Sequence, residues 1–230
     1  MAVWRIPPHS NTVHLVVTDR QLAVQVAGLG SPISVDFQTG RCAYRRHHGG
    51  SELLAKALGL RRRRHPYIID ACAGFGQDAW IMAGLGCRVD LLERSPLVAA
   101  VLNDGLQRAA ATPEAQRLRL YCVDARQHLA ELSPEQQPDI VYLDPMYPER
   151  NTTALAGKAA RALRAVVGDD ADADELFVVA RRCARHRVVV KRPRHAVYLG
   201  NTLPDLHYQG RSTRFDVYLS ASAAPPSLPA

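Results

Sequence analysis

The chain has 230 residues, of which 47% are hydrophobic, and it carries a formal net charge of +7 at pH 7. This length and composition suit one α/β domain with a sizeable core, and no apolar run comes near the roughly 20 residues that a membrane-spanning helix needs. The five cysteines are scattered and none forms a C-x-x-C pair, which indicates neither a disulfide framework nor a zinc site. We therefore expect a cytoplasmic protein with no membrane partner and no bound metal.

The positive charge is concentrated near the N-terminus. Ten Arg and Lys but only three Asp and Glu precede Tyr67, whereas nineteen residues of each sign lie from there onward. Such an excess favours a phosphate-rich partner, because arginines that displace counterions bind nucleic acid without reading its sequence. The predicted contacts to that partner are Arg45, Arg46, Arg61 and Arg62. For the run 61–64, a solvated helix end is an equally good interpretation.

Residues 1–65 predict a β-rich basic extension. Apolar and polar residues alternate in short runs over 12–17, 22–26 and 33–37, and a segment rich in glycine interrupts them before residue 33. Alternation with a period of two is typical of strands with one buried face. A short helix is expected over 51–60, where leucines and alanines share one face.

From residue 66 to 220 the pattern changes to strands alternating with helices. The predicted strands are 67–71, 88–92, 118–123, 139–143, 187–191 and 214–220, and the predicted helices are 77–85, 96–110, 158–167 and 172–185. This order predicts an α/β domain with a mostly parallel sheet covered by helices on both faces. Ligands of such sheets bind at the carboxyl ends of the strands. The final segment, 221–230, contains three prolines and is expected to be a disordered tail.

An acidic residue follows each of the first three strands of this domain. These residues are Asp70, Glu93 and Asp124, and the topology brings them to one edge of the sheet. Gly74 and Gly76 follow Asp70 and turn the chain into a helix, so that backbone can approach a ligand closely. Glu93 stands where nucleotide-binding α/β folds place the carboxylate that binds ribose hydroxyls. The segment therefore predicts a cofactor that contains a nucleoside.

Two cofactors fit this segment: NAD, or the methyl donor S-adenosylmethionine. The complete G-x-G-x-x-G fingerprint of dinucleotide folds would need glycine at position 79, where this chain has Ala79. Asp78 is the stronger discriminator, because together with Asp70 it would repel a pyrophosphate but would suit a sulfonium cation with an amino-acid end. We favour S-adenosylmethionine.

The strand over 139–143 leads into Asp144-Pro145-Met146-Tyr147-Pro148. Asp/Asn-Pro-x-aromatic after a strand is the signature of enzymes that methylate an exocyclic amine of a base. Asp144 and the carbonyl of Pro145 can accept the hydrogens of that amine, and two prolines restrict the loop. Tyr147 offers a face on which a flipped-out base can stack. The predicted catalytic residues are therefore Asp144, Pro145 and Tyr147, and the alternative is a proline-rich turn after a core strand.

A basic stretch without an acid runs from residue 181 to residue 194. Lys191 and Arg192 end the strand over 187–191, on the same sheet edge as Asp144. We interpret them as residues that guide RNA phosphates toward the pocket. For the helical arginines of this stretch, a solvated face is at least as good an interpretation.

Several segments carry a family resemblance. They are residues 35–37, 45–46, 49–50, 70–78, 92–100, 104–106, 141–148, 188–193 and 214–218. The run from Leu92 to Leu106 and the Asp-Pro-Met-aromatic-Pro form are its specific parts. On these motifs the chain resembles the ribosomal RNA small subunit methyltransferase J family, bacterial enzymes that methylate the N2 amine of one guanine in 16S rRNA.

The resemblance implies a class I methyltransferase fold with a seven-stranded Rossmann-like sheet. It implies S-adenosylmethionine as cofactor and 16S rRNA or the small ribosomal subunit as partner. The cofactor ligands that it implies are Gln77, Asp78, Glu93, Arg94, Arg126, Gln127 and Asp144. The chain departs from the family at Gln77, where an arginine is common, and at Arg126–Gln127, where small hydroxyl residues are common.

Two further interpretations stay open at this point. The enzyme could methylate another RNA, at guanine N2 or at adenine N6. Alternatively, the chain could be a non-catalytic RNA-binding protein of ribosome assembly that retains a vestigial cofactor pocket. The second interpretation predicts RNA binding that depends on salt but no affinity for S-adenosylmethionine.

Overall fold

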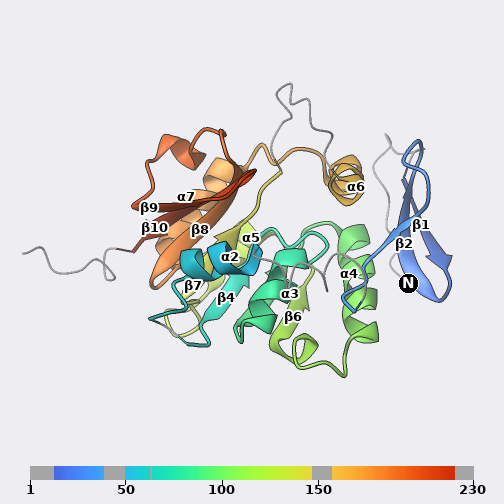
Figure 1. Ribbon diagram of the computed structural model, residues 1–230, viewed down its shortest axis with the longest axis horizontal. Coiled ribbons are helices and arrows are strands. Elements are labelled where there is room, and N and C mark those ends of the chain that lie inside the picture. Colours follow the sequence, from blue (N-terminus) through green and yellow to red (C-terminus); the bar gives the residue numbers. More distant parts are fainter. Residues whose placement is uncertain (1–12, 39–49, 63, 147–156, 221–230) are drawn as a thin grey trace, which may run out of the picture.

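A computed structural model gives the arrangement of the chain in space, and it describes residues 13–38, 50–62, 64–146 and 157–220. Two sheets are present in these residues, one of three strands and one of seven (Figure 1). No helix in the described ranges is long and apolar enough to cross a membrane. The predicted disordered tail, 221–230, lies outside the described residues.

The seven-stranded sheet forms the centre of the molecule. Its strands are β4 (Tyr67–Asp70), β5 (Arg88–Leu92), β6 (Leu118–Tyr121), β7 (Ile140–Leu143), β8 (Arg187–Pro193), β9 (Leu206–Gln209) and β10 (Thr213–Leu219). Their spatial order is β6-β5-β4-β7-β8-β10-β9. The five strands from β6 to β8 are parallel, whereas β10 runs antiparallel to both β8 and β9. The predicted mostly parallel α/β fold is therefore confirmed.

Helices cover both faces of this sheet. One face packs on α2 (Gly50–Leu58), α3 (Gln77–Gly84) and α4 (Pro96–Arg108), and the other packs on α5 (Ala125–Glu131) and α7 (Ala173–Cys183). Neighbouring strand residues face opposite ways, so Ile68 belongs to the first core and Ile69 to the second. The strands are therefore apolar on both sides, as buried parallel strands require. Two short 3-10 helices, Ala115–Arg117 and Leu199–Asn201, complete the described elements of this domain besides α6.

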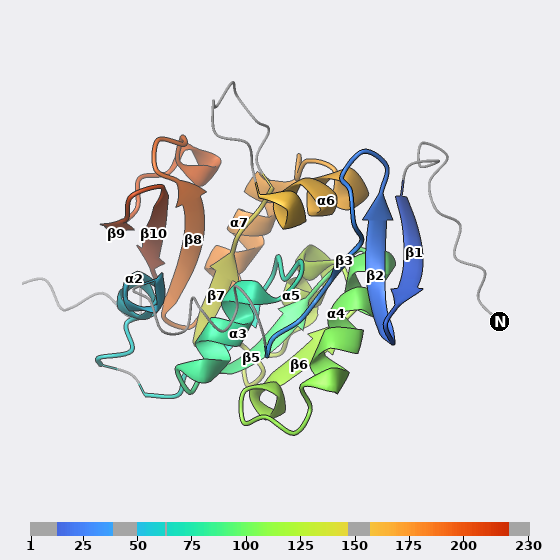
Figure 2. The ribbon, with the colours of Figure 1, turned by 45° about the vertical axis from the view of Figure 1, so that its right-hand side comes forward.

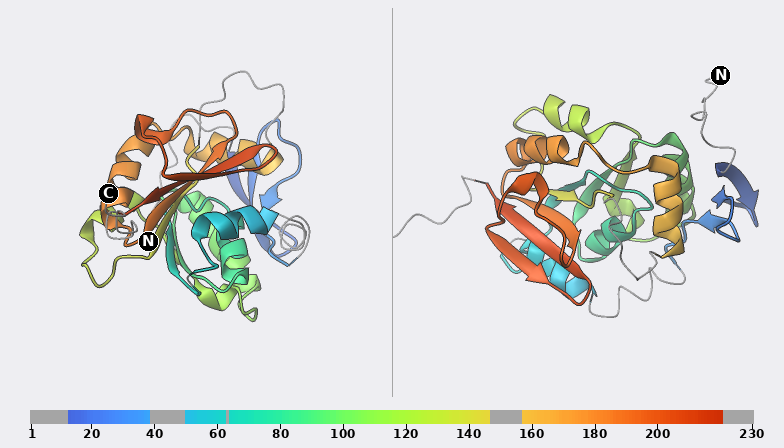
Figure 3. Two further views of the ribbon diagram at one scale, coloured as in Figure 1. Left: turned by 60° about the vertical axis from the view of Figure 1, so that its left-hand side comes forward. Right: turned by 90° about the horizontal axis from the view of Figure 1, so that it is seen from above.

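The smaller sheet lies at the side of the domain, against helices. It consists of β1 (Val13–Thr18), β2 (Gln21–Val26) and β3 (Ile33–Ser34), all antiparallel. Strand β2 packs against α4 and against α6 (Lys158–Val167), with the hairpin outermost (Figures 2 and 3). The Phe37 ring stacks on Trp80 of α3 with 4.3 Å between ring centroids. The N-terminal residues thus share a core with the α3–α4 face of the large sheet.

The predicted strands and helices are present in the structure, although the run over 33–37 forms a strand only at Ile33–Ser34 and the two 3-10 helices were not predicted. Helix α5 and strand β9 were not predicted. Helix α5 has only seven residues, and β9 is an edge strand with three exposed residues and one half-buried residue, so neither gives a clear periodic signal. The division at residue 65 stays a prediction, although α2, which lies before it, packs on β9 and β10.

Candidate active site

The loop after β4 is built on two glycines with positive φ. Gly74 has φ 52° and Gly76 has φ 71°, in the left-handed region that other residues avoid. The N–H of Gly74 donates to Glu93 Oε2 at 2.9 Å, and Asp70 Oδ1 accepts from the N–H of Cys72 at 3.3 Å. Helix α3 then begins at Gln77. The predicted glycine loop is thus held by carboxylates from two adjacent strands.

Glu93 connects the ends of β4 and β5. Its second oxygen, Oε1, accepts from the N–H of Ser95 at 2.7 Å, and its side chain is buried. Burial raises the pKa of Glu93, while the hydrogen bonds from Ser95 and Gly74 oppose that rise. Each carboxylate oxygen has a second lone pair, so the predicted role of Glu93 toward a ribose is compatible with these bonds.

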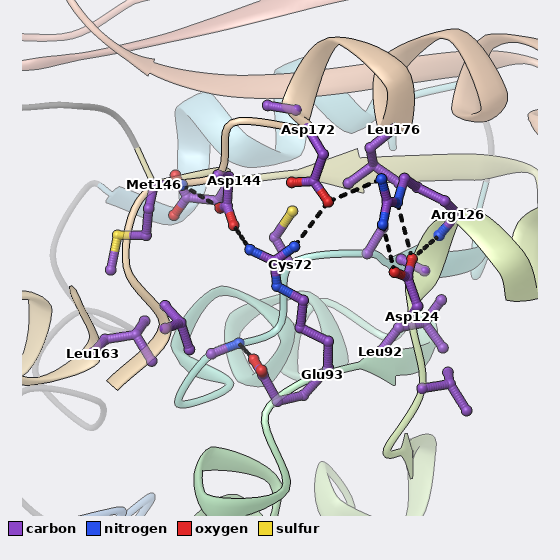
Figure 4. A pocket seen from close by; sticks show the side chains of 18 residues that line it. Cys72, Leu92, Glu93, Asp124, Arg126, Asp144, Met146, Leu163, Asp172 and Leu176 are labelled. Atoms are coloured by element: carbon purple, nitrogen blue, oxygen red, sulfur yellow. Dashed lines mark hydrogen bonds and ion pairs between the residues drawn. The ribbon is translucent and has the colours of Figure 1, made fainter. Parts of the chain in front are cut away.

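A narrow cavity of about 60 Å³ lies beside Glu93, between the carboxyl ends of β4, β5 and β6 and the helices α6 and α7 (Figure 4). Its apolar wall includes Leu92, Val123, Leu163, Val167 and Leu176. Its polar lining comprises Glu93, Arg94, Asp124, Arg126, Asp144, Asp170 and Asp172. An apolar slot edged by carboxylates suits a nucleoside, since the base is flat and apolar and the ribose carries hydroxyl donors.

Two arginines bridge the rim of this cavity. Arg94 donates to Asp170 Oδ1 at 2.5 Å and to Asp172 Oδ2 at 2.8 Å. Arg126 donates to Asp124 Oδ2 at 2.8 Å and lies 3.2 Å from Asp172 Oδ2 (Figure 4). The hydrogen bonds from Arg126 lower the pKa of Asp124 from its usual value. Ion pairs between side chains therefore connect the turns after β5 and β6 to the α6–α7 loop.

Sequence reasoning missed Asp170 and Asp172 as residues of this site. Both lie in an acidic cluster without metal-ligand spacing, and nothing in the sequence connects this cluster with Arg94. Their partner Arg94 lies 76 residues away from Asp170 in the chain. The only available signal was an unexplained cluster of acids next to a predicted helix. Asp172 does occupy the N-cap position of α7, but its side chain makes no capping bond there.

A second, wider cavity of about 280 Å³ adjoins the first and shares Cys72, Gly74, Asp144, Met146 and Leu163 with it. The remaining lining includes Asp70, Gln77, Asp78, Tyr142, Pro145 and Lys191. The loop after β7, which is predicted to be catalytic, is fixed by a hydrogen bond here, since the N–H of Met146 donates to Asp170 Oδ2 at 2.6 Å. Asp144 keeps 39% of its side chain exposed, so a substrate can reach it.

Charged groups are crowded in the second cavity. Lys191 Nζ donates to Asp78 Oδ2 at 2.6 Å and to Asp144 Oδ2 at 2.8 Å. The hydroxyl of Tyr142 donates to Asp78 Oδ2 at 2.7 Å. Asp70 lies in the same cluster, where burial and the nearby Asp78 raise its pKa to about 8. Lys191 thus links Asp78 of the predicted cofactor loop to Asp144 of the loop after β7.

The structure corrects the predicted RNA contacts at the end of β8. Arg192 is only 1% exposed, and its guanidinium donates to the carbonyl of Val197, so it cannot bind phosphates. Lys191 is 18% exposed and is engaged by two carboxylates of the site. Alternation along β8 turns these two side chains inward on opposite faces, which the basic composition of the segment did not reveal.

The remaining predicted site residues fall into three groups. Arg61 and Arg62 are exposed in the turn after α2, where they are available to a partner. Gln127 is exposed on α5 and is not among the residues that line the two cavities. Arg45, Arg46 and Tyr147 lie outside the described residues.

The residues at the two cavities fit S-adenosylmethionine. The first cavity offers an apolar slot with the carboxylates Glu93 and Asp124, and the second offers the carboxylates Asp78 and Asp144, which suit a sulfonium and an ammonium group. Gly74 lines both cavities with backbone alone, whereas Gly76, also predicted as a cofactor residue, lines neither and faces the core at Leu102 and Phe37. In the part of the chain that the structure describes, no three His, Cys, Asp or Glu side chains are grouped so that they could hold a metal ion.

Comparison with known proteins agrees with this interpretation. Residues 3–220 match the model of a family described as putative SAM-dependent methyltransferase. A crystal structure of a SAM-dependent methyltransferase from Neisseria gonorrhoeae is 38% identical, with a TM-score of 0.75, over 94% of this chain and 86% of that one. Fold and site thus define an S-adenosylmethionine-dependent methyltransferase.

Curated relatives specify the family further. The ribosomal RNA small subunit methyltransferase J of Nitrosococcus oceani is 44% identical over 91% of this chain and 85% of its own length. The protein of the same name from Cellvibrio japonicus is 43% identical over 89% of this chain and 82% of its own. The chain belongs to the ribosomal RNA small subunit methyltransferase J family.

Proposed function

We propose that this enzyme methylates the exocyclic N2 amine of one guanine in 16S rRNA of the small ribosomal subunit, in the cytoplasm. The observation that carries the proposal is the position of Asp144, which is partly exposed in a cavity that also contains the glycine loop. The substrate is inferred from the relatives, which are named ribosomal RNA small subunit methyltransferase J. We infer the base and its N2 position from the family resemblance and from the Asp-Pro-x-aromatic motif.

The proposed chemistry assigns Asp144 and Pro145 to the amine. The nitrogen lone pair of a guanine amine is delocalised into the ring, so it attacks carbon poorly. Hydrogen bonds from the amine to the Asp144 carboxylate and the Pro145 carbonyl draw the nitrogen toward tetrahedral geometry and fix its direction of attack. S-adenosylmethionine, when bound, supplies an electrophilic methyl group. Asp144 then accepts the proton that the methylated nitrogen loses, and passes it to solvent through its exposed side.

Recognition of the RNA is assigned to two groups of residues. Arg61 and Arg62 are exposed and carry charge that suits phosphates. Arg45 and Arg46 are proposed to act with them, and Tyr147 is proposed to stack on the flipped-out guanine. These contacts predict affinity for rRNA that falls as salt rises.

The test is methyl transfer from labelled S-adenosylmethionine to small subunits and to extracted 16S rRNA, both from a strain that lacks the gene. A single N2-methylguanine, mapped by nuclease digestion, is expected. Asp144→Ala should lower the rate about 10² to 10³-fold, which is typical of losing one oriented polar group at a reacting centre. Glu131→Gln, an exposed change on α5, is the matched control and should retain full activity.

Each other outcome has a definite meaning. Full activity of Asp144→Ala would remove the proposed role of the loop. Methylation of adenine N6 or of another RNA would show that the enzyme acts on that substrate instead. Salt-sensitive RNA binding without affinity for S-adenosylmethionine in calorimetry would instead identify a non-catalytic assembly protein.

A further inference from the structure

Lys191 is held by two carboxylates in the part of the site that faces the substrate. Its Nζ lies 2.6 Å from Asp78 Oδ2 and 2.8 Å from Asp144 Oδ2, and only 18% of its side chain is exposed. Asp78 also accepts a hydrogen bond from Tyr142 at 2.7 Å. The result is a connected chain from the cofactor loop, through one ammonium group, to the catalytic loop.

Strand register explains why Lys191 reaches Asp144. Strands β7 and β8 are parallel, with Leu143 beside Val190, so the next residue of each strand is adjacent at the sheet edge. Tyr142 belongs to the core that packs on α3, and alternation turns Asp144 to that same face. Asp78 meets them there from the first turn of α3. The arrangement therefore belongs to the regular part of the fold.

The surroundings of Lys191 keep it charged. Burial by itself would lower the pKa of this lysine, but the carboxylates of Asp144 and Asp78 outweigh burial and raise it above its usual value. The interaction is reciprocal, because a permanent positive charge beside a carboxylate stabilises the ionised form of that carboxylate. Without Lys191, Asp78 and Asp144 would each lose an ammonium group that lies within 2.8 Å of a carboxylate oxygen.

We propose that Lys191 is a positioning residue for methyl transfer, which holds the carboxylate of Asp144 ionised and in a fixed orientation toward the substrate amine. This inference rests on the function proposed above. If Asp144 were protonated, it would accept hydrogen bonds from the substrate amine less well. If its side chain rotated, it would orient the amine away from the direction of attack. Lys191 acts through Asp144 and takes no part in the bonds that change.

Other titratable groups also face Asp144 and belong in any account of its ionisation. They are Asp70 from β4, Cys72 from the glycine loop, Asp78 from α3, Tyr142 from β7 and Lys191 from β8. Helix α6 contributes Ala159, Ala160 and Leu163 to the cavity wall, and these are uncharged. Among the described residues, Lys191 is the cation that lines the second cavity with Asp144, whereas Arg94, Arg126 and Asp170 line the first cavity with it.

The test compares Lys191→Met, which removes the charge at similar length, with Lys191→Arg, which keeps it. Lys56→Met is the matched control, because Lys56 pairs with Glu52 in an exposed i,i+4 bridge on α2. In Lys191→Met, kcat at pH 7 should fall about 100-fold, as expected for a misplaced catalytic group, while KM for rRNA changes less than threefold. The acidic limb of its pH–rate profile should move up by about 1 to 2 pH units, because Asp144 then protonates more readily. In Lys191→Arg this limb should stay near its wild-type position.

A second readout does not depend on methyl transfer. Carbon-13 NMR of the aspartate carboxyl groups, with Asp144 assigned through Asp144→Asn, should show Asp144 titrating at higher pH in Lys191→Met than in the wild type. In the wild-type protein it should titrate below the value of about 3.9 of an unperturbed aspartate, a comparison that holds even if Lys191→Met fails to fold.

The two proposals fail in distinguishable ways. Wild-type enzyme that methylates no RNA would contradict the proposed function, whereas the NMR titration would still test the Lys191–Asp144 coupling. An unshifted acidic limb in folded Lys191→Met, or a wild-type Asp144 that titrates at or above about 3.9, the value of an unperturbed aspartate, would overturn the role of Lys191. A uniform loss of rate at every pH would also overturn it, because that result indicates a structural role only.

Discussion

Gly76, which precedes α3, provides a test of how the cofactor loop is built. Its backbone has φ 71° and ψ 15°, and the residue lies at the N-cap of the helix. A Cβ placed on Gly76 would lie 2.7 Å from Leu102 Cδ1, 3.3 Å from the Phe37 ring and 3.4 Å from Leu91 Cδ2. All three neighbours are buried, so they have little room to move. Gly76→Ala should therefore suffer both backbone strain and overpacking.

The magnitude follows from these two contributions. A left-handed conformation costs a residue with a Cβ about 1 to 2 kcal/mol. Forcing a methyl group into a packed core costs about 1 to 3 kcal/mol more. Gly76→Ala should thus lower the free energy of unfolding by about 2 to 5 kcal/mol, a large part of the 5 to 15 kcal/mol typical of a domain.

Gly28→Ala is the matched control. Gly28 has φ 77°, but a Cβ there would meet nothing within 4 Å. Both variants carry the same backbone cost and the same loss of freedom in the unfolded chain, so their difference isolates packing. Urea denaturation of the two variants and the wild type measures this difference. If Gly76→Ala is no less stable than Gly28→Ala, the packing argument is refuted.

Two further predictions concern the acids and the arginine of the site. Because the pKa of Asp70 is raised to about 8, the folded protein keeps the proton of this carboxyl group at a pH where the unfolded chain has released it. The free energy of unfolding of the wild type should therefore fall relative to that of Asp70→Asn as pH rises from about 4 to 8. Urea denaturation of both proteins at pH 5 and pH 8 measures this change, and a wild type that loses no stability relative to Asp70→Asn between the two pH values contradicts the prediction. Arg94→Met should change the free energy of unfolding by less than about 1 kcal/mol, since the Arg94 side chain is 38% exposed. It should nevertheless weaken S-adenosylmethionine binding, because Asp170 and Asp172 lose their ion pairs with Arg94 at the rim of the cavity. An unchanged Kd for S-adenosylmethionine in calorimetry would argue against this role.

Local sequence determined much of the fold and the position of the main loops. Apolar runs gave the parallel strands, because a strand covered on both faces must be apolar throughout. The acids Asp70, Glu93 and Asp124 were assigned to one edge because parallel strands end together there. Helix α5 and strand β9 escaped prediction, since one is short and the other is an exposed edge strand.

Tertiary structure alone decided which charges meet. Lys191 and Arg192 are adjacent in a basic stretch, yet one turns to Asp78 and Asp144 and the other is buried beside the carbonyl of Val197. The position of Asp170 at the rim of the site depends on the fold, which places the α6–α7 loop next to Arg94. Sequence periodicity predicts which residues of one helix or strand are buried, because the direction of each side chain follows from the local geometry of that element. Ion pairing between elements depends on register and packing distances, which are set only when the whole sheet has formed.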